Sequence, residues 1–215
     1  LVSLSELGWI GAVAGAIQLA LALWLDPRLV WLLILVWGYY GLMSAEFFAR
    51  TWLKAHPLVY LCSHMLILPL IVLYATACDW LVNGAAMPLP GLLGFLLMSV
   101  FNGVVFEIGR KIRAPEDEQV GVETYSALWG IKPAAVAWVG ALALSAAAGA
   151  WVAVEIGFVV PVLAVAATLL AAAALVAARF LNAPNAKRAK AIDTMSGLWI
   201  LSLLLIVGVL PVVIR

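Results

Sequence analysis

The stretch GFVVPVLAVAATLLAAAALVAARF, residues 157–180, decides the fold class of this chain. Its one charged side chain, Arg179, stands next to its end, and an α-helix needs about 20 apolar residues to cross the hydrocarbon core of a bilayer. Six other stretches are long enough to do the same. We therefore expect seven spans, near residues 6–25, 29–49, 57–78, 88–108, 132–153, 157–180 and 194–213.

The composition favours a membrane protein over a soluble one. The 215 residues are 67% hydrophobic and 11% charged, with a mean hydropathy of +1.15, whereas soluble domains are about half apolar and about a quarter charged. The sequence therefore predicts an all-α, polytopic transmembrane helical bundle that forms a single domain over residues 1–215. The net charge of +1 argues against nucleic acid as a partner.

The basic residues are divided unevenly between the two sides of the membrane that these spans define. One side holds Arg50, Lys54, Arg110, Lys111, Arg113, Lys132, Arg179, Lys187, Arg188 and Lys190. The other side holds Arg28 and Arg215. Cytoplasmic loops carry an excess of Lys and Arg. The sequence therefore predicts an inner-membrane or plasma-membrane protein with a cytoplasmic N-terminus and an external C-terminus.

Acidic residues gather in one segment, between the fourth and fifth expected spans. It reads FNGVVFEIGRKIRAPEDEQVGVETY, residues 101–125, and a solvated loop would carry such charges too. Asn102 and Glu107, however, precede the loop and lie within apolar sequence, where polar side chains are costly. Glu107 and Lys111, four residues apart, share one helical face. Carboxylates beside Arg and Lys at a membrane surface suit a Mg²⁺-bound diphosphate.

The segment from Asn102 to Gly130 resembles the second acidic motif of the UbiA superfamily of intramembrane prenyltransferases. In that motif, carboxylates at a helix end are followed by a Gly-x-x-Thr turn into the next helix. Here Asp117 stands four residues before Gly121, and Gly121-Val-Glu-Thr124 supplies the turn. The stretch around Tyr40 is similar to the family's tyrosine-containing segment. The order of spans is similar to that of the last seven of the family's nine helices.

The chain departs from the family pattern in two places. The family's first acidic motif, an Asn with several Asp, has no counterpart, and Arg110, Lys111 or Arg113 stands where the second motif has further carboxylates. The chain begins at Leu1 without a methionine. We therefore expect an upstream segment with two more helices, and we expect residues 1–215 alone to be inactive.

The resemblance implies an enzyme that transfers a polyprenyl group from its diphosphate to an aromatic or lipid acceptor, with Mg²⁺ as the cofactor. It implies Glu107, Asp117 and Lys111 as catalytic residues. The metal ligands it implies are Asn102, Glu107 and Asp117. The substrate-binding residues it implies are Asn102, Arg110, Arg113, Tyr40, Tyr60 and His64. The expected partners are polyprenyl diphosphate, a hydrophobic acceptor and membrane lipid.

Several alternatives stay open at this point. The imidazole of His64 could accept a proton from the acceptor substrate, or it could be a neutral histidine bonded to a neighbouring helix. The whole chain could be a transporter or carrier with the acidic loop as its gate. Transporters show internal repeats and charges near the midplane, whereas here no repeat is evident and the charges cluster at one face. A non-catalytic family member that binds lipid or a partner is the third reading.

Overall fold

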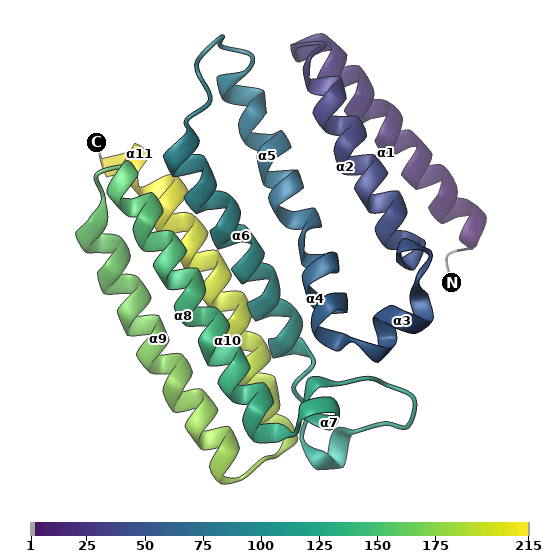
Figure 1. Cartoon of the computed structure of the whole chain (residues 1–215). Coiled ribbons are helices and arrows are strands. Elements are labelled where there is room, and N and C mark those ends of the chain that lie inside the picture. Colours follow the sequence, from purple (N-terminus) through teal and green to yellow (C-terminus); the bar gives the residue numbers. More distant parts are fainter. Residues whose placement is uncertain (1–2, 215) are drawn as a thin grey trace. The chain divides into compact units, whose positions relative to one another are not determined.

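The computed structural model of the chain describes residues 3–214 and is built from helices (Figure 1). Helix accounts for 84% of the chain, and no strand occurs among the residues described. The predicted all-α class is confirmed. The helices fall into two compact units, residues 1–88 and residues 89–215, and each unit is described by itself.

The first unit is a set of apolar helices joined by short turns. Its helices are α1 (Leu4–Leu25), α2 (Leu29–Ser44), α3 (Arg50–Ala55), α4 (Pro57–Met65) and α5 (Ile67–Trp80), with a short 3-10 turn, η1, at Glu46–Phe48. Ala22, Leu29, Leu33 and Ala77 form the small buried cluster where α1, α2 and α5 meet. The helix boundaries follow local signals, since α1 ends at Asp26-Pro27 and α4 begins with proline, which is favoured at the first helical position.

The second expected span, 29–49, is shorter in the structure. The helix ends at Ser44 because Glu46, Phe47 and Phe48 all adopt positive φ angles, which reverse the right-handed helical path. At 16 residues, α2 is about 24 Å long, less than the roughly 30 Å of a hydrocarbon core. Within residues 3–214, six helices, rather than the predicted seven, are long and apolar enough to cross a membrane.

The third expected span, 57–78, is a broken helix. It is divided at Leu66 into α4 and α5, because Pro69 has no N–H to donate to the carbonyl of Met65. The hydroxyl of Tyr39 in α2 donates a hydrogen bond of 2.6 Å to the carbonyl of Ser63, close to the break. A side chain from a neighbouring helix thus satisfies a backbone group where the helix is interrupted.

The second unit is a bundle of long helices. Its helices are α6 (Leu89–Arg110), α7 (Tyr125–Trp129), α8 (Ile131–Glu155), α9 (Val159–Asn182), α10 (Ala186–Leu204) and α11 (Leu210–Ile214), with a π-helical turn at Leu205–Val209. The charged connection predicted at 181–193 is much shorter than expected, because α10 begins at Ala186. The side chain of Asn185 accepts a hydrogen bond of 3.0 Å from the Arg188 N–H and caps the helix.

Side-chain hydrogen bonds between helices and small residues at helix contacts hold the second unit together. Trp138 of α8 donates from Nε1 to the hydroxyl of Ser196 of α10 at 2.9 Å, and both side chains are fully buried. Gly109 of α6 faces the same contact, where a Cβ atom would lie 2.0 Å from Ser196 Oγ. Only a residue without a side chain allows α6 and α10 to approach this closely.

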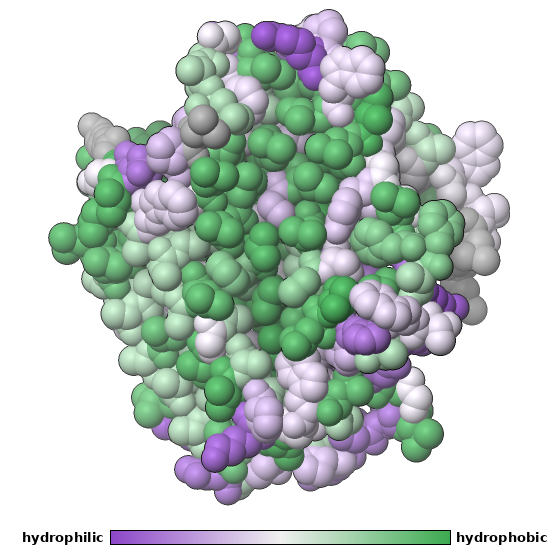
Figure 2. Space-filling view, viewed as in Figure 1, coloured by the Kyte–Doolittle hydropathy of each residue, from purple (hydrophilic) through white to green (hydrophobic). Residues whose placement is uncertain are grey.

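Hydrophobic side chains cover most of the displayed face, and hydrophilic residues gather towards the helix ends (Figure 2). The six candidate spans are Ser5–Leu25, Pro57–Trp80, Pro90–Arg110, Ile131–Glu155, Val159–Asn182 and Ala186–Ile214. Helices of this length and composition are those of an integral membrane protein, as the sequence predicts. The direction in which the chain crosses the membrane stays a prediction.

Candidate functional site

Most charged residues of the second unit lie on segments at one end of its bundle, where helix ends and the connection from α6 to α8 meet (Figure 1). At this end α6 and α9 finish, at Arg110 and Asn182, while α8 and α10 begin, at Ile131 and Ala186. The basic side chains found here are Arg110, Lys111, Arg113, Lys132, Arg179, Lys187, Arg188 and Lys190. The connection from α6 to α8 adds the carboxylates Glu116, Asp117, Glu118 and Glu123. The uneven charge distribution predicted from the sequence is therefore also a spatial one within this unit.

Glu107 is a buried carboxylate held between two cations. It lies in the last turn of α6 and is 7% exposed. Its Oε2 accepts a hydrogen bond of 2.7 Å from Arg110 Nε, and its Oε1 lies 2.8 Å from Lys111 Nζ. The structure confirms the shared helical face of Glu107 and Lys111. Both carboxylate oxygens are occupied by cations, as a buried carboxylate requires.

An aromatic side chain covers this group of charges. Tyr125, at the start of α7, is 3% exposed, and Lys111 Nζ lies 5.8 Å from the centroid of its ring, within reach of a cation–π interaction. The N–H of Tyr125 donates a hydrogen bond of 3.0 Å to the carbonyl of Lys111. The ring centroids of Tyr125 and Trp129 lie 4.4 Å apart. Tyr125, at the start of α7, is therefore held against Lys111, the residue that follows α6.

The connection that precedes α7 is fixed by hydroxyl groups. Gly121 has a φ of +86°, the left-handed region that favours glycine. Thr124 caps α7, and its hydroxyl donates a hydrogen bond of 2.6 Å to Oε2 of Glu118. The hydroxyl of Ser126 accepts a hydrogen bond of 2.7 Å from the N–H of Arg113. The Gly-x-x-Thr turn into the next helix, predicted at residues 121–124, is confirmed.

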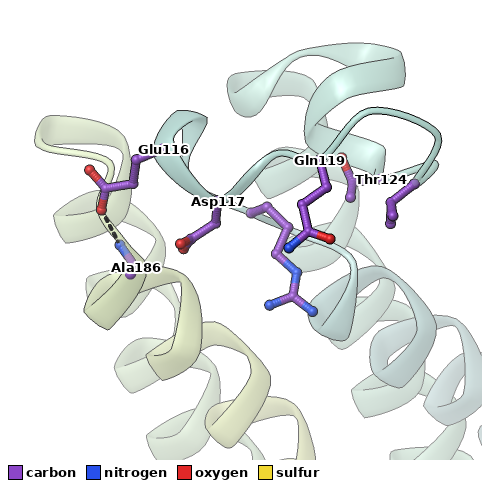
Figure 3. Close-up of a pocket in the computed structure, with 7 residues that line it drawn as sticks. Glu116, Asp117, Gln119, Thr124 and Ala186 are labelled. Atoms are coloured by element: carbon purple, nitrogen blue, oxygen red, sulfur yellow. Dashed lines mark hydrogen bonds between the residues drawn. The ribbon is translucent and has the colours of Figure 1, made fainter.

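A pocket opens beside this connection, with a cavity volume of about 430 Å³. Its lining residues are Arg113, Glu116, Asp117, Gln119, Val122, Thr124 and Ala186. The Oε1 atom of Glu116 accepts a hydrogen bond of 2.9 Å from the N–H of Ala186, which joins the loop to the start of α10. Figure 3 shows Asp117 next to this bond, with Gln119 and Thr124 further along the loop. Both charges needed to bind a metal-bound anion, the Asp117 carboxylate and the Arg113 guanidinium, are therefore present.

Asn102 lies elsewhere, in the core of the bundle. It is 5% exposed, and its Oδ1 accepts a hydrogen bond of 2.7 Å from Ser145 of α8. The Ser145 hydroxyl in turn accepts one of 3.1 Å from Trp199 Nε1 of α10. The structure thus brings Glu107, Arg110 and Lys111 together, and it brings Arg113 and Asp117 together. The Asn102 oxygen has its partner in the core network.

The remaining predicted substrate-binding residues belong to the first unit. Tyr40 is 59% exposed, whereas its neighbour Tyr39 makes the hydrogen bond to Ser63 described above. The rings of Tyr60 and His64 stack with their centroids 3.9 Å apart. Tyr60 and His64 are therefore brought together in one contact.

The oxygen ligands suited to Mg²⁺ lie in the pocket. Mg²⁺ keeps several waters and usually binds through one or two carboxylates plus substrate phosphates. Asp117 supplies one carboxylate, and the side chain of Gln119 adds a neutral oxygen. Within residues 3–214, no group of three or more His, Cys, Asp and Glu side chains is placed to hold a metal ion. The donor set fits a cation that arrives with a diphosphate.

Three residues of this site have contacts that the sequence reasoning did not predict. Glu116 joins the loop to α10 by a hydrogen bond. Glu118 accepts a hydrogen bond from the hydroxyl of Thr124, and the hydroxyl of Ser126 accepts one from the backbone N–H of Arg113. The run Glu116-Asp117-Glu118 is visible in the sequence, but nothing in it distinguishes Glu116 and Glu118, whose carboxylates stabilise the loop, from Asp117. That division depends on the position of α10 and of α7.

Comparison with models of known protein families, with curated proteins and with solved structures found no match for this chain.

Proposed function

We propose that the charged end of the second unit binds the diphosphate of a polyprenyl diphosphate, and that the protein transfers the prenyl group to a hydrophobic acceptor. The observation that carries this proposal is the pocket beside α6, α7 and α10, which joins Asp117 to Arg113 at the end of an apolar bundle. A diphosphate belongs at the charged end, and a prenyl chain belongs along apolar helices. A polyprenyl diphosphate likewise has a charged diphosphate at one end and an apolar prenyl chain next to it.

In this reaction the allylic carbon–oxygen bond to the diphosphate breaks and a bond from that carbon to the acceptor forms. The acceptor loses one proton and diphosphate leaves. Mg²⁺, when bound with the substrate, neutralises charge on the departing diphosphate. Asp117 would hold that cation, and Arg113 would donate hydrogen bonds to phosphate oxygens, where a planar guanidinium binds well.

Glu107 has a different part in this proposal. Its oxygens contact Arg110 and Lys111, so its role is to hold these two cations in position rather than to bind the metal. A carboxylate that fixes the direction of two basic side chains preorganises them for an anion. In this arrangement the cations need little rearrangement when the diphosphate arrives.

We also propose that this end faces the cytoplasm, with the N-terminus on the same side and the C-terminus external; this orientation counts the shorter apolar helix α2 as a crossing beside the six candidate spans. The excess of basic residues supports this orientation. Val120 stands fully exposed in the loop, so Val120→Cys in a background without Cys62 and Cys78 gives a labelling site. We expect a membrane-impermeant maleimide to react only after the cells are opened. Reaction in intact cells would reverse the orientation.

The function is tested in membranes that contain the protein overexpressed together with any residues encoded upstream of Leu1, and that supply the acceptor. Radiolabelled prenyl diphosphates of increasing chain length are added with Mg²⁺, and label in the lipid extract is measured. We expect Mg²⁺-dependent incorporation to fall by about a hundredfold in Asp117→Asn, about 3 kcal/mol of barrier, and to stay unchanged in the matched Glu155→Gln variant at the other end of α8. No incorporation above that of membranes without the protein, at every chain length, would contradict the proposal.

A further inference from the structure

The connection between α2 and α3 contains an unusual backbone. Glu46, Phe47 and Phe48 have φ angles of 52°, 51° and 56°. Residues with side chains visit this left-handed region mostly one at a time, and each such residue costs about 1–2 kcal/mol. Three in succession form a strained turn, which persists only where the surroundings hold it in place. We call residues 46–48 the left-handed turn.

Contacts from α2 and α4 hold this turn. The ring of Phe47 lies edge-on to Tyr39 of α2, with centroids 5.5 Å apart, and edge-on to His64 of α4 at 6.0 Å. Glu46 reaches the same histidine, since its Oε2 lies 3.6 Å from His64 Nε2. Glu46 and Phe47 therefore both reach His64, which makes the imidazole the centre of the contact.

The hydrogen bonds of His64 decide where its protons are. His64 Nδ1 lies 2.9 Å from the carbonyl oxygen of Tyr60, which can only accept, so Nδ1 carries a proton. In the neutral ring Nε2 then has a lone pair, and that lone pair faces the carboxylate of Glu46. Glu46 Oε2 is buried and has no hydrogen-bond partner among the described residues. Two acceptors facing each other repel, and a single proton between them would turn repulsion into a hydrogen bond.

The other titratable groups near this pair have different partners. The hydroxyl of Tyr39 donates to the carbonyl of Ser63, and the ring of Tyr60 stacks on His64. His56 of α3 places Nδ1 2.8 Å from the carbonyl of Trp52. Among the ion pairs of the described residues, Glu46 has one partner, His64. The neighbouring basic residues of α3, Arg50 and Lys54, are thus not the cations that neutralise it.

We propose that Glu46 and His64 form a proton-binding site, in which one shared proton fastens the left-handed turn to α4. When water supplies the proton, Nε2 and Oε2 are bridged and the strained backbone is held. When hydroxide removes it, the carboxylate and the neutral imidazole repel, and the turn is released together with the start of α3. This site is independent of the proposed prenyl transfer and belongs to the other unit of the chain.

Trypsin gives a local measurement, because Arg50 and Lys54 follow the turn directly and are exposed. Cleavage at these two positions is followed in the detergent-solubilised full chain between about pH 6 and about pH 9, the range around histidine titration. Glu46→Gln is the matched control at each pH. Its amide can donate to Nε2 without an added proton, so it keeps the shape and needs no shared proton.

We expect cleavage of the wild-type chain, relative to Glu46→Gln, to rise at least threefold from the lower to the higher pH. His64→Asn should remove the rise, while His56→Asn should retain it. An equal pH response in the wild type and Glu46→Gln would overturn the proposal. If Glu46→Gln does not fold, ¹⁵N NMR of the imidazole in the wild type provides the test. The proposal requires a proton on Nδ1 and a hydrogen-bonded Nε2 near neutral pH, and a ring with bare Nδ1 would refute it.

Discussion

In the second unit, 50% and 44% of an 18-residue apolar stretch is buried in α6 and α8, whereas the share is 6% in each of the spans Ser5–Leu25 and Pro57–Trp80 of the first unit. The second unit packs large tryptophans and small residues into a continuous core and ties it with side-chain hydrogen bonds between helices. The first unit has a small core of four buried residues. Its long-range polar contacts are one exposed hydrogen bond between helices, from Trp37 Nε1 of α2 to Gln18 Oε1 of α1 at 3.0 Å, besides those at a turn and at the broken helix. Stability is therefore expected to depend on buried helix crossings in the second unit and more on connections and exposed contacts in the first.

Gly109 gives the largest expected effect. In Gly109→Ala, the new Cβ would lie 2.0 Å from Ser196 Oγ and 3.1 Å from Trp138 Nε1, and these two groups are hydrogen-bonded to each other. We expect a loss of about 3 kcal/mol in the free energy of unfolding, the upper range for overpacking a core. Unfolding in mixed detergent micelles measures it. Gly11→Ala in α1, where nothing lies within 4 Å, is the control and should cost nothing. Equal effects of both changes would remove the contrast between the two units.

Ser145 gives the next largest effect. Ser145→Ala would leave both Asn102 Oδ1 and Trp199 Nε1 without the partner they have now. Because buried polar groups without partners are costly, we expect a loss of about 1.5 kcal/mol. Thr168→Ala is the matched control in α9, since Thr168 bonds only to the carbonyl of Ala164 in its own helix. A loss for Thr168→Ala as large as that for Ser145→Ala would show that bonds between helices have no special weight here.

The left-handed turn supplies a change of opposite sign in the first unit. Phe48 is 86% exposed and has a φ of 56°, so Phe48→Gly removes strain while the contacts of Phe47 and Glu46 stay. We expect a gain of about 1 kcal/mol in the free energy of unfolding. Leu42→Gly, a half-exposed position inside α2, should lose about 1 kcal/mol, because glycine disfavours helix. A loss for Phe48→Gly would mean that the turn is not strained.

The smallest effect concerns acid stability at the connection between α1 and α2. The Arg28 guanidinium, hydrogen-bonded at 2.7 Å to the carboxylate, lowers the pKa of Asp26 below its usual value, and Arg28 also donates to the carbonyl of Leu81. A lowered carboxyl pKa contributes stability above the ordinary value of about 4, and this is lost as pH falls through the lowered pKa. Asp26→Asn should therefore flatten the stability profile slightly below about pH 4. An unchanged profile would mean that the pair contributes nothing.

Within residues 3–214, six of the seven spans that hydropathy predicted correspond to helices long and apolar enough to cross a membrane, and the places where hydropathy failed have physical causes. It extended the second span to residue 49, because the sequence stays largely apolar through the backbone reversal at Glu46–Phe48, and hydropathy does not detect such a reversal. It started the last span at 194, although α10 begins at Ala186. The charged first two turns of α10 extend beyond the apolar stretch, and only the cap at Asn185 marks their start.

The candidate site was predicted in part. The pairing of Glu107 with Lys111 follows from their spacing in one helix, whereas the turn at Gly121 is expected only from the resemblance of residues 102–130 to a family motif. The partner of Asn102, Ser145, lies in another helix and could not be read from local sequence. The same is true of Glu46 and His64, which stand in different helical elements and meet only because the left-handed turn folds back on α4.

The proposed diphosphate site is tested most directly by the binding of geranylgeranyl diphosphate to residues 1–215 in detergent, measured by calorimetry with and without Mg²⁺. We expect weak, Mg²⁺-dependent binding that falls about tenfold, about 1.4 kcal/mol, in Asp117→Asn and in Arg113→Gln, and that is unchanged in Glu155→Gln. Binding that is independent of Mg²⁺ and equal in all four proteins would contradict the claim, and would mean that the charged end of the second unit is not a diphosphate site.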